Sequence, residues 1–332
     1  MHLKTNLPKK ILAWYDNNKR PLPWRVSNNS HKKLYYRLLS EFMLQQTQVK
    51  TVIPYFKKFT DKFPTLESLS KSNEKKILKL WEGLGYYRRA RNLLTTSKIL
   101  VTKKKSKLPN SLEEIKKLPG IGEYTANALL GLVYNQPTIA LDGNVKRVFS
   151  RILNKQDSKI NFEKFIELNK KILFNTKRNS DFVEALMEFG ALICKPKEPK
   201  CNICNIRNEC KYLSSSKKFL TTKFKIIKYK NYDIFCYVNK NKQIALTKDN
   251  NLGFLNKFYL PHIKETKKNN KKNWKFLNKY QNLISNKKLN INLYYKFTNK
   301  IPPSFTWYSI EKNKEFIPNF TKKIFKQVST IF

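Results

Sequence analysis

Four of the chain's five cysteines lie in one short segment and follow the pattern C-x6-C-x2-C-x5-C. They are Cys194, Cys201, Cys204 and Cys210, and Cys236 lies apart from them. Four thiolates in one loop can surround a metal centre, either a cubane iron–sulfur cluster or a structural zinc. Disulfides are the alternative. We discount them because residues 1–10 hold no apolar signal segment, and we expect a reducing compartment, the cytoplasm.

Glycine is scarce, and four of the eight glycines form two pairs, Gly83 with Gly85 and Gly120 with Gly122. This usage indicates positive φ or close backbone approach at those positions. The second pair lies in Leu-Pro-Gly-Ile-Gly, between helical segments predicted over 112–117 and 123–134. A helix that begins after a tight turn exposes backbone N–H groups, and these bind phosphate without sequence preference. The string predicts a helix-hairpin-helix element.

The elements that position these residues are helical up to about residue 212. Apolar side chains recur at helical spacing over 11–15, 34–44, 49–59, 77–81, 126–133 and 182–192. Ser111 with Glu114 predicts a capping box. After a polar linker, strands are predicted over 232–238, 243–247 and 289–295, with a closing helix over 321–328. The fold class is therefore mostly α, followed by a smaller α+β domain.

The net charge is +45, from 68 basic and 23 acidic side chains. Such a field attracts polyanions, and nucleic acid is the natural partner. The alternative is coding bias toward lysine, which raises the charge without a function. Arg88, Arg89 and Arg91 follow the first glycine pair, and a guanidinium suits phosphate. No stretch holds the roughly 18 apolar residues of a membrane span.

Some twenty residues after the hairpin, Asp142 stands beside Gly143. Alone, such an aspartate is more often a turn residue or helix N-cap. In the order hairpin, Asp142 and cysteine cluster, the chain resembles the endonuclease III superfamily of helix-hairpin-helix DNA glycosylases. Within it, the strings over 22–25, 39–49, 83–88 and 141–147 resemble adenine DNA glycosylases of the MutY type. Lyase members carry a lysine where this chain has Tyr124, which leaves hydrolysis of the base.

The resemblance implies a monofunctional enzyme of base-excision repair with a [4Fe–4S] cluster on the four cysteines. It would hydrolyse the N-glycosidic bond of adenine mispaired with 8-oxoguanine or guanine in double-stranded DNA, acting as a monomer on the cytoplasmic nucleoid. A lyase acting on oxidised pyrimidines is the runner-up, and a non-catalytic mismatch-binding module is the alternative from another class.

Roles follow residue by residue from the same resemblance. Glu41 matches the general acid, although on residues alone an ion pair with Arg37 is the simpler interpretation. Asp142 matches the carboxylate that stabilises the sugar cation, and Tyr124 matches a tyrosine that orients it. The base pocket is expected from Leu22, Trp24, Arg25, Glu184 and Met187, although Trp24 could equally be core. DNA contacts are expected from Gln46, Thr47, Tyr86, Arg88, Gly120, Gly122 and Ser285.

The same resemblance divides the chain into domains. It implies a cluster subdomain over 1–26 and 131–212, a helix-hairpin-helix subdomain over 27–130, a linker over 213–227, and a Nudix-like domain over 228–332 that senses 8-oxoguanine. The family's recognition loop reads Phe-Ser-His, and its best register here is Ile284, Ser285 and Asn286. A hydrolysing Nudix motif is not visible, so we expect no nucleotide hydrolysis.

Overall fold

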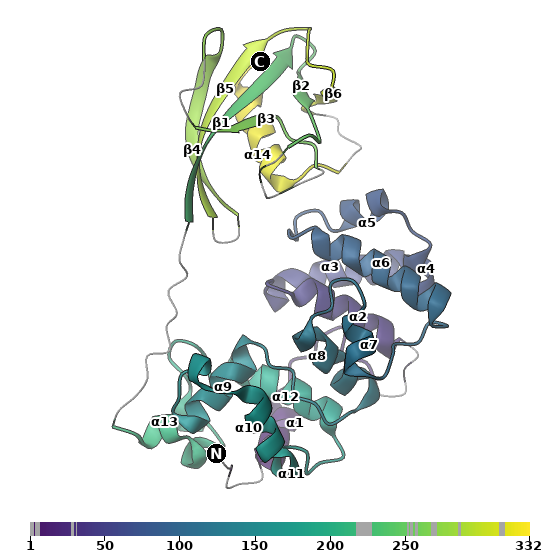
Figure 1. Ribbon diagram of the computed structural model, residues 1–332, viewed down its shortest axis with the longest axis vertical. Coiled ribbons are helices and arrows are strands. Elements are labelled where there is room, and N and C mark those ends of the chain that lie inside the picture. Colours follow the sequence, from purple (N-terminus) through teal and green to yellow (C-terminus); the bar gives the residue numbers. More distant parts are fainter. Residues whose placement is uncertain are drawn as a thin grey trace. The chain divides into compact units, whose positions relative to one another are not determined.

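The computed structural model describes residues 3, 7–27, 30, 32–216, 228–250, 252, 255, 258–266, 271–284, 287–311 and 316–332. The chain divides into two compact units (Figure 1). One comprises Met1–Glu74 with Tyr86–Lys223, and the other comprises Lys75–Gly85 with Phe224–Phe332. None of the helices in these described ranges is long and apolar enough to span a bilayer.

The first unit is helical, as the apolar spacing predicts. Its α-helices are α1 (Leu7–Asn18), α2 (Lys33–Leu44), α3 (Val49–Lys62), α4 (Leu66–Ser70), α6 (Arg88–Lys103), α7 (Leu112–Lys116), α8 (Glu123–Tyr134), α9 (Gly143–Leu153), α10 (Phe162–Leu168), α11 (Lys170–Leu173), α12 (Asn179–Leu192) and α13 (Lys211–Ser214). Short 3₁₀ turns are η1 (Asp157–Lys159), η2 (Cys201–Ile203) and η3 (Arg207–Glu209). Helix α5 (Glu74–Leu80) begins at the boundary between the units.

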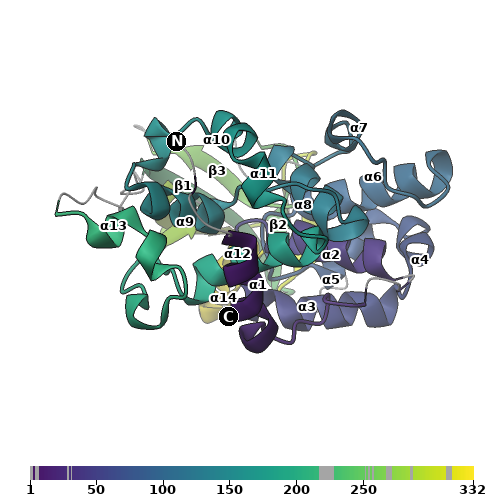
Figure 2. The same cartoon turned by 90° about the horizontal axis from the view of Figure 1, so that it is seen from below.

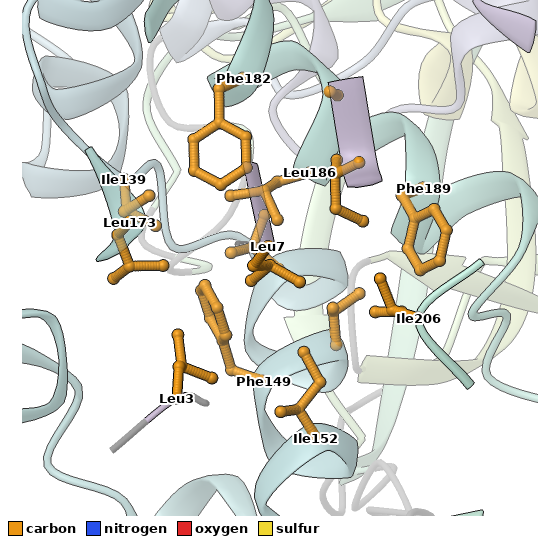
Figure 3. Close-up of a cluster of buried hydrophobic side chains, with 14 of the residues drawn as sticks. Leu3, Leu7, Ile139, Phe149, Ile152, Leu173, Phe182, Leu186, Phe189 and Ile206 are labelled. Atoms are coloured by element: carbon orange, nitrogen blue, oxygen red, sulfur yellow. The ribbon is translucent and has the colours of Figure 1, made fainter. Parts of the chain in front are cut away.

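Helix α12 is the central element of the first unit. It packs against α1, α8 and α9, and α1 lies beside it in both views (Figures 1 and 2). A helix enclosed on several sides is apolar around most of its circumference, and Phe182, Leu186 and Phe189 are fully buried. Figure 3 shows these side chains gathered with Leu7 of α1 and Phe149 of α9.

The second unit contains a six-stranded mixed sheet within the residues described. Its strands are β1 (Lys228–Asn239), β2 (Gln243–Leu246), β3 (His262–Glu265), β4 (Lys275–Ile284), β5 (Lys287–Phe297) and β6 (Thr306–Ser309). The order is β4-β5-β1-β2-β6, and β3 also pairs with β1. Strands β1 and β5 are parallel, with Ile234 opposite Leu293, whereas the other pairs are antiparallel.

One face of this sheet is covered by helix α14 (Asn319–Val328), which continues into η4 (Ser329–Ile331). The period-two pattern places Ile234 and Leu293 on that face, where they share a core with Ile324 of α14 (Figure 1). The predicted strands and closing helix are therefore confirmed as an α+β region.

Candidate active site

Glu41 is a buried carboxyl on the inner side of α2. The residue is 5% exposed. Burial raises the pKa of Glu41 to about 7, an effect to which Asp142 adds and which Tyr124 and Arg37 oppose. The spacing suggested an ion pair between Glu41 and Arg37, but Arg37 pairs with Glu184 instead. Arg37 directs both terminal nitrogens to Glu184, at 2.5 and 3.2 Å.

Asp142 is the N-cap of α9, which is the simple role that its sequence context favours. Its Oδ1 accepts from the Val145 N–H at 2.7 Å, and its Oδ2 accepts from the Asn144 amide at 2.9 Å. Burial raises the pKa of Asp142 even though these two donors favour the carboxylate. The cap therefore holds a half-buried carboxylate at the start of α9, and this carboxylate raises the pKa of Glu41.

Tyr124, in the first turn of α8, interacts electrostatically with both of these carboxyls. Its hydroxyl lies 3.4 Å from Met187 Sδ and hydrogen-bonds with Glu41. Burial raises its pKa well above the ordinary value, and Glu41 and Asp142 raise it further. Glu41 of α2 and Tyr124 of α8 are thus hydrogen-bonded, and Asp142 at the N-cap of α9 acts on both electrostatically. Such an arrangement can deliver a proton from one carboxyl and stabilise a cation with the other.

A buried ionic network lies beside this group. Arg25 Nε donates to Glu184 at 3.1 Å, and Tyr15 donates to the same carboxylate at 2.8 Å. Burial alone would raise the pKa of Glu184, but Arg37 and Arg25 outweigh it and hold that pKa below its ordinary value. The neighbouring Glu188 carboxylate accepts hydrogen bonds from both Arg20 and Arg25. Glu184 is therefore an ionised group with both oxygens engaged.

The predicted pocket residues divide into two groups. Arg25, Glu184 and Met187 lie around the group just described. Trp24 is 3% exposed and packs edge-on against Phe56 of α3, with ring centroids 5.3 Å apart, as the core alternative predicts. Leu22 is also buried.

The expected DNA contacts lie mostly on exposed turns. Gln46 (φ 55°) and Tyr86 (φ 46°) both have left-handed backbones, which ordinary residues adopt only at a cost. Tyr86 is 44% exposed, and Thr47 follows Gln46 in the same turn. Arg88 is exposed at the start of α6. Ser285 lies outside the described residues.

The hairpin glycines differ from each other. Gly120 has φ 80°, and a Cβ there would lie 2.7 Å from Asn92 Cβ and 2.9 Å from Phe42 Cε1. Gly122 has φ −90° and is the N-cap of α8, and a Cβ there would meet nothing within 4 Å. Positive φ is thus wrong for Gly122, and the remaining expectation there, close approach to its backbone, stays a prediction. Ser111 caps α7 through the Glu114 N–H, while the Glu114 carboxylate pairs with Lys117, so only half of the predicted box forms.

The four cysteines of the cluster line one cavity of about 30 Å³. Arg151 Nη1 lies 3.3 Å from Cys194 Sγ, and backbone N–H groups reach the sulfurs of Cys204 and Cys210. Within the described ranges, no three His, Cys, Asp or Glu side chains converge tightly enough to hold a single metal ion. The thiols therefore surround a space instead of meeting at a point.

Sequence reasoning missed the residues that connect these sites. Asn144 donates to Asp142, Arg147 Nη2 donates to Asn144 Oδ1 at 2.8 Å, and Arg147 Nε donates to the Cys194 carbonyl at 2.8 Å. Asn144 and Arg147 lie three residues apart in the helix after the Asp142 cap, and this spacing could have indicated that their side chains meet. It also missed Arg89, which is buried although we expected it to meet phosphate. Arg89 lies four residues before Leu93, on the apolar face of α6, and this helical spacing could have indicated that Arg89 is buried.

Comparison with known proteins defines the class first. Residues 39–171 match the family model described as HhH-GPD superfamily base excision DNA repair protein. A solved structure of a thermostable thymine-DNA glycosylase matches with a TM-score of 0.55 at 27% identity, covering 62% of this chain and 94% of that one. The fold of the first unit is therefore that of the helix-hairpin-helix base excision repair proteins.

Curated relatives narrow the class. The adenine DNA glycosylase of Buchnera aphidicola subsp. Baizongia pistaciae (strain Bp) is 40% identical over 316 residues, which is 88% of this chain and 86% of the relative. That of Buchnera aphidicola subsp. Schizaphis graminum (strain Sg) is 40% identical over 258 residues, 72% of each chain. The chain belongs to the adenine DNA glycosylase family, as its motifs predict.

Proposed function

We propose that this protein removes adenine mispaired with 8-oxoguanine or guanine from double-stranded DNA by hydrolysis. The observation that supports the proposal is a buried Glu41 that hydrogen-bonds with Tyr124 and whose pKa Asp142 raises. The pKa of Glu41, about 7, suits an acid that works at neutral pH. The curated names of the relatives agree with this substrate base.

In this mechanism, Glu41 gives its proton to a ring nitrogen of adenine, and the bonding electrons leave with the base. The sugar becomes cationic at C1′, and Asp142 stabilises it through a transient adduct that water opens. Tyr124 keeps the two carboxyls apart and oriented. Because position 124 lacks a lysine amine, no Schiff base forms there, and the product is an abasic site.

The extruded adenine would lie between Arg25, Glu184 and Met187 on one side and the Glu41 carboxyl on the other. Extruding a base costs a few kcal/mol of stacking. Gln46 and Tyr86, which lie on exposed turns, would enter the duplex and fill the space. Thr47, Arg88 and the N–H groups at Gly120 and Gly122 would hold the phosphates.

The four cysteines fit a [4Fe–4S] cluster. Their sulfurs line a common cavity and receive N–H donors, which is how protein hydrogen bonds tune such sulfurs. Cys194, Cys201, Cys204 and Cys210 would hold the cluster, which would keep the basic loop around Lys200 in shape against the DNA backbone. The purified protein should be brown and contain about four irons per chain. A colourless protein with one zinc would refute the cluster.

The layout of domains is part of the proposal. A cluster subdomain over 1–26 and 131–212 is supported by the core that joins α1 with α9 and α12, and 27–130 would form the hairpin subdomain. The Nudix-like assignment over 228–332 rests on the mixed sheet with its helix. The proposed recognition residues begin at Ile284, the last residue of β4. Ser285 lies outside the described residues, and Ser285→Ala should reduce the preference for A·8-oxoguanine over A·G.

Strand scission on labelled duplexes tests the activity. Duplexes with A·8-oxoguanine, A·G or A·T are incubated with the protein and then treated with or without alkali. Cleavage at the mispaired adenine only after alkali is expected, with Glu41→Gln inactive but still bound. Cleavage without alkali would instead support the lyase, and binding without product would support the non-catalytic module.

A further inference from the structure

Arg89 is a buried arginine in the first turn of α6. Its residue is 6% exposed, so it cannot meet a phosphate in this conformation. Its Nη1 donates to the carbonyls of Phe42 and Met43, at 3.2 and 2.6 Å, and to that of Gln45. The last carbonyls of a helix have no intrahelical partner. Arg89 therefore completes the C-terminus of α2.

The same guanidinium also contacts the other exposed turn. Its central carbon lies 5.4 Å from the centroid of the Tyr86 ring, within the range of a cation–π contact. The Arg89 N–H also donates to the Tyr86 carbonyl at 2.9 Å. One side chain thus contacts the turn before Gln46 and the ring of Tyr86.

Both turns have strained backbones. Gln46 and Tyr86 have positive φ without being glycine, and such conformations persist only where the surroundings enforce them. The carbonyls that Arg89 holds lie within the four residues before Gln46, that of Gln45 directly before it, and the Arg89 backbone N–H binds the Tyr86 carbonyl. Burial lowers the pKa of Arg89 to about 10, so the group is still charged near neutral pH.

We propose that Arg89 is a positioning residue that couples Gln46 and Tyr86, so that both side chains enter the duplex as one unit. The inference rests on the proposed function, which makes these two residues the ones that fill the space left by the base. A lysine cannot replace Arg89, because an ammonium has no planar face that contacts the Tyr86 ring while a nitrogen donates to the carbonyls at the end of α2.

The test measures base unstacking separately from bond cleavage. A 2-aminopurine is placed beside the mispaired adenine, and its fluorescence rise is followed at saturating protein. On the other side of the mispair, one duplex has a G·C pair and the other has an A·T pair. The full chain is compared with Arg89→Lys, which keeps the charge, and with Lys98→Ala, which removes a charge from an exposed position on the same helix.

Arg89→Lys should slow unstacking on the G·C-flanked duplex about tenfold, the ratio expected for losing one charge-assisted hydrogen bond. The deficit should shrink on the A·T-flanked duplex, where unstacking is easier. Lys98→Ala should match the unsubstituted chain on both duplexes, and thermal unfolding verifies that each variant is folded.

Equal rates for Arg89→Lys and the unsubstituted chain would overturn the inference. An equal deficit on both duplexes would overturn it too, because a smaller folded fraction lowers both rates alike. No fluorescence rise with the unsubstituted chain would also overturn it. Failure of the proposed activity has a different signature, since bases would unstack but no alkali-sensitive product would form.

Discussion

Glu41 and Glu184 are two buried glutamates of the same site whose pKa values are shifted in opposite directions. Burial raises the pKa of Glu41 to about 7. Glu184 is as deeply buried, but Arg37 and Arg25 more than offset the burial and lower its pKa. Separated pKa values of this kind assign acid and ion roles at a catalytic site. Arg37 and Arg25 thus keep the pocket carboxylate Glu184 charged, whereas burial keeps Glu41 protonated against the opposing effect of Arg37.

The first prediction concerns stability and pH. The folded chain protonates Glu41 up to about pH 7, whereas an unfolded glutamate ionises near 4.5. Stability from the neutral carboxyl is therefore fully present below pH 4.5 and lost as the pH rises through 7. Glu41→Gln should gain free energy of unfolding relative to the unsubstituted chain between pH 5 and pH 8, by up to ~3 kcal/mol. Urea unfolding measures this, and a pH-independent difference would contradict it.

The second prediction concerns Tyr124. Hydrogen bonding from Tyr124 lowers the pKa of Glu41, so Tyr124→Phe should raise it. The upper limb of the pH profile for single-turnover base release should move to higher pH, while the rate at its maximum falls because the carboxyls lose an orienting group. An unchanged profile would remove Tyr124 from the site.

Motifs predicted individual residues well where a residue type is itself the signal. Asp142 and Tyr124 were singled out through their strings, and their place in a site with Glu41 stays a prediction, which their electrostatic effects on Glu41 support. Arg89 was misread because three arginines in four positions do not reveal which one faces inward. Trp24 could be assigned to the pocket or to the core, and only the contact with Phe56 distinguishes these positions.

At the scale of elements, the hairpin between α7 and α8 combines a packing glycine with an open one. Gly120 needs positive φ and leaves no room for a Cβ, whereas Gly122 needs neither. Apolar spacing located the helices but not their ends, since it gave 11–15 for α1 and 77–81 for α5. Helix α8 begins and ends where the hairpin string predicted. The parallel pairing of β1 with β5 could not be predicted, because period-two alternation determines which face a side chain is on but not which strands are neighbours.

The third prediction compares the stability and duplex binding of two variants of the hairpin, Gly120→Ala and Gly122→Ala. Gly120→Ala should destabilise the protein by about 1–3 kcal/mol, because its Cβ has no room and its φ is left-handed. Gly122→Ala should leave the unfolding midpoint unchanged while weakening duplex binding, because a methyl group comes between the helix start and the phosphate. Equal stability of the two variants would contradict this account of the turn.

At the scale of the whole molecule, the charge of +45 has two explanations, binding or coding bias. The fourth prediction separates them. If basic side chains meet phosphates, the logarithm of the binding constant for an unmodified duplex falls linearly with the logarithm of salt concentration, by about 0.9 per phosphate neutralised. Filter binding between about 50 and 200 mM salt should then give a steep slope. A slope near zero would assign the charge to bias.

The central claim is that a buried carboxylic acid at Glu41 protonates the departing adenine. The most direct measurement is the single-turnover rate of adenine release from an A·8-oxoguanine duplex as a function of pH. We expect the rate to fall about tenfold per pH unit above the Glu41 pKa of about 7, and to be abolished in Glu41→Gln at every pH. A rate that stays flat from pH 6 to pH 9, or a Glu41→Gln variant as fast as the unsubstituted chain, would contradict the claim.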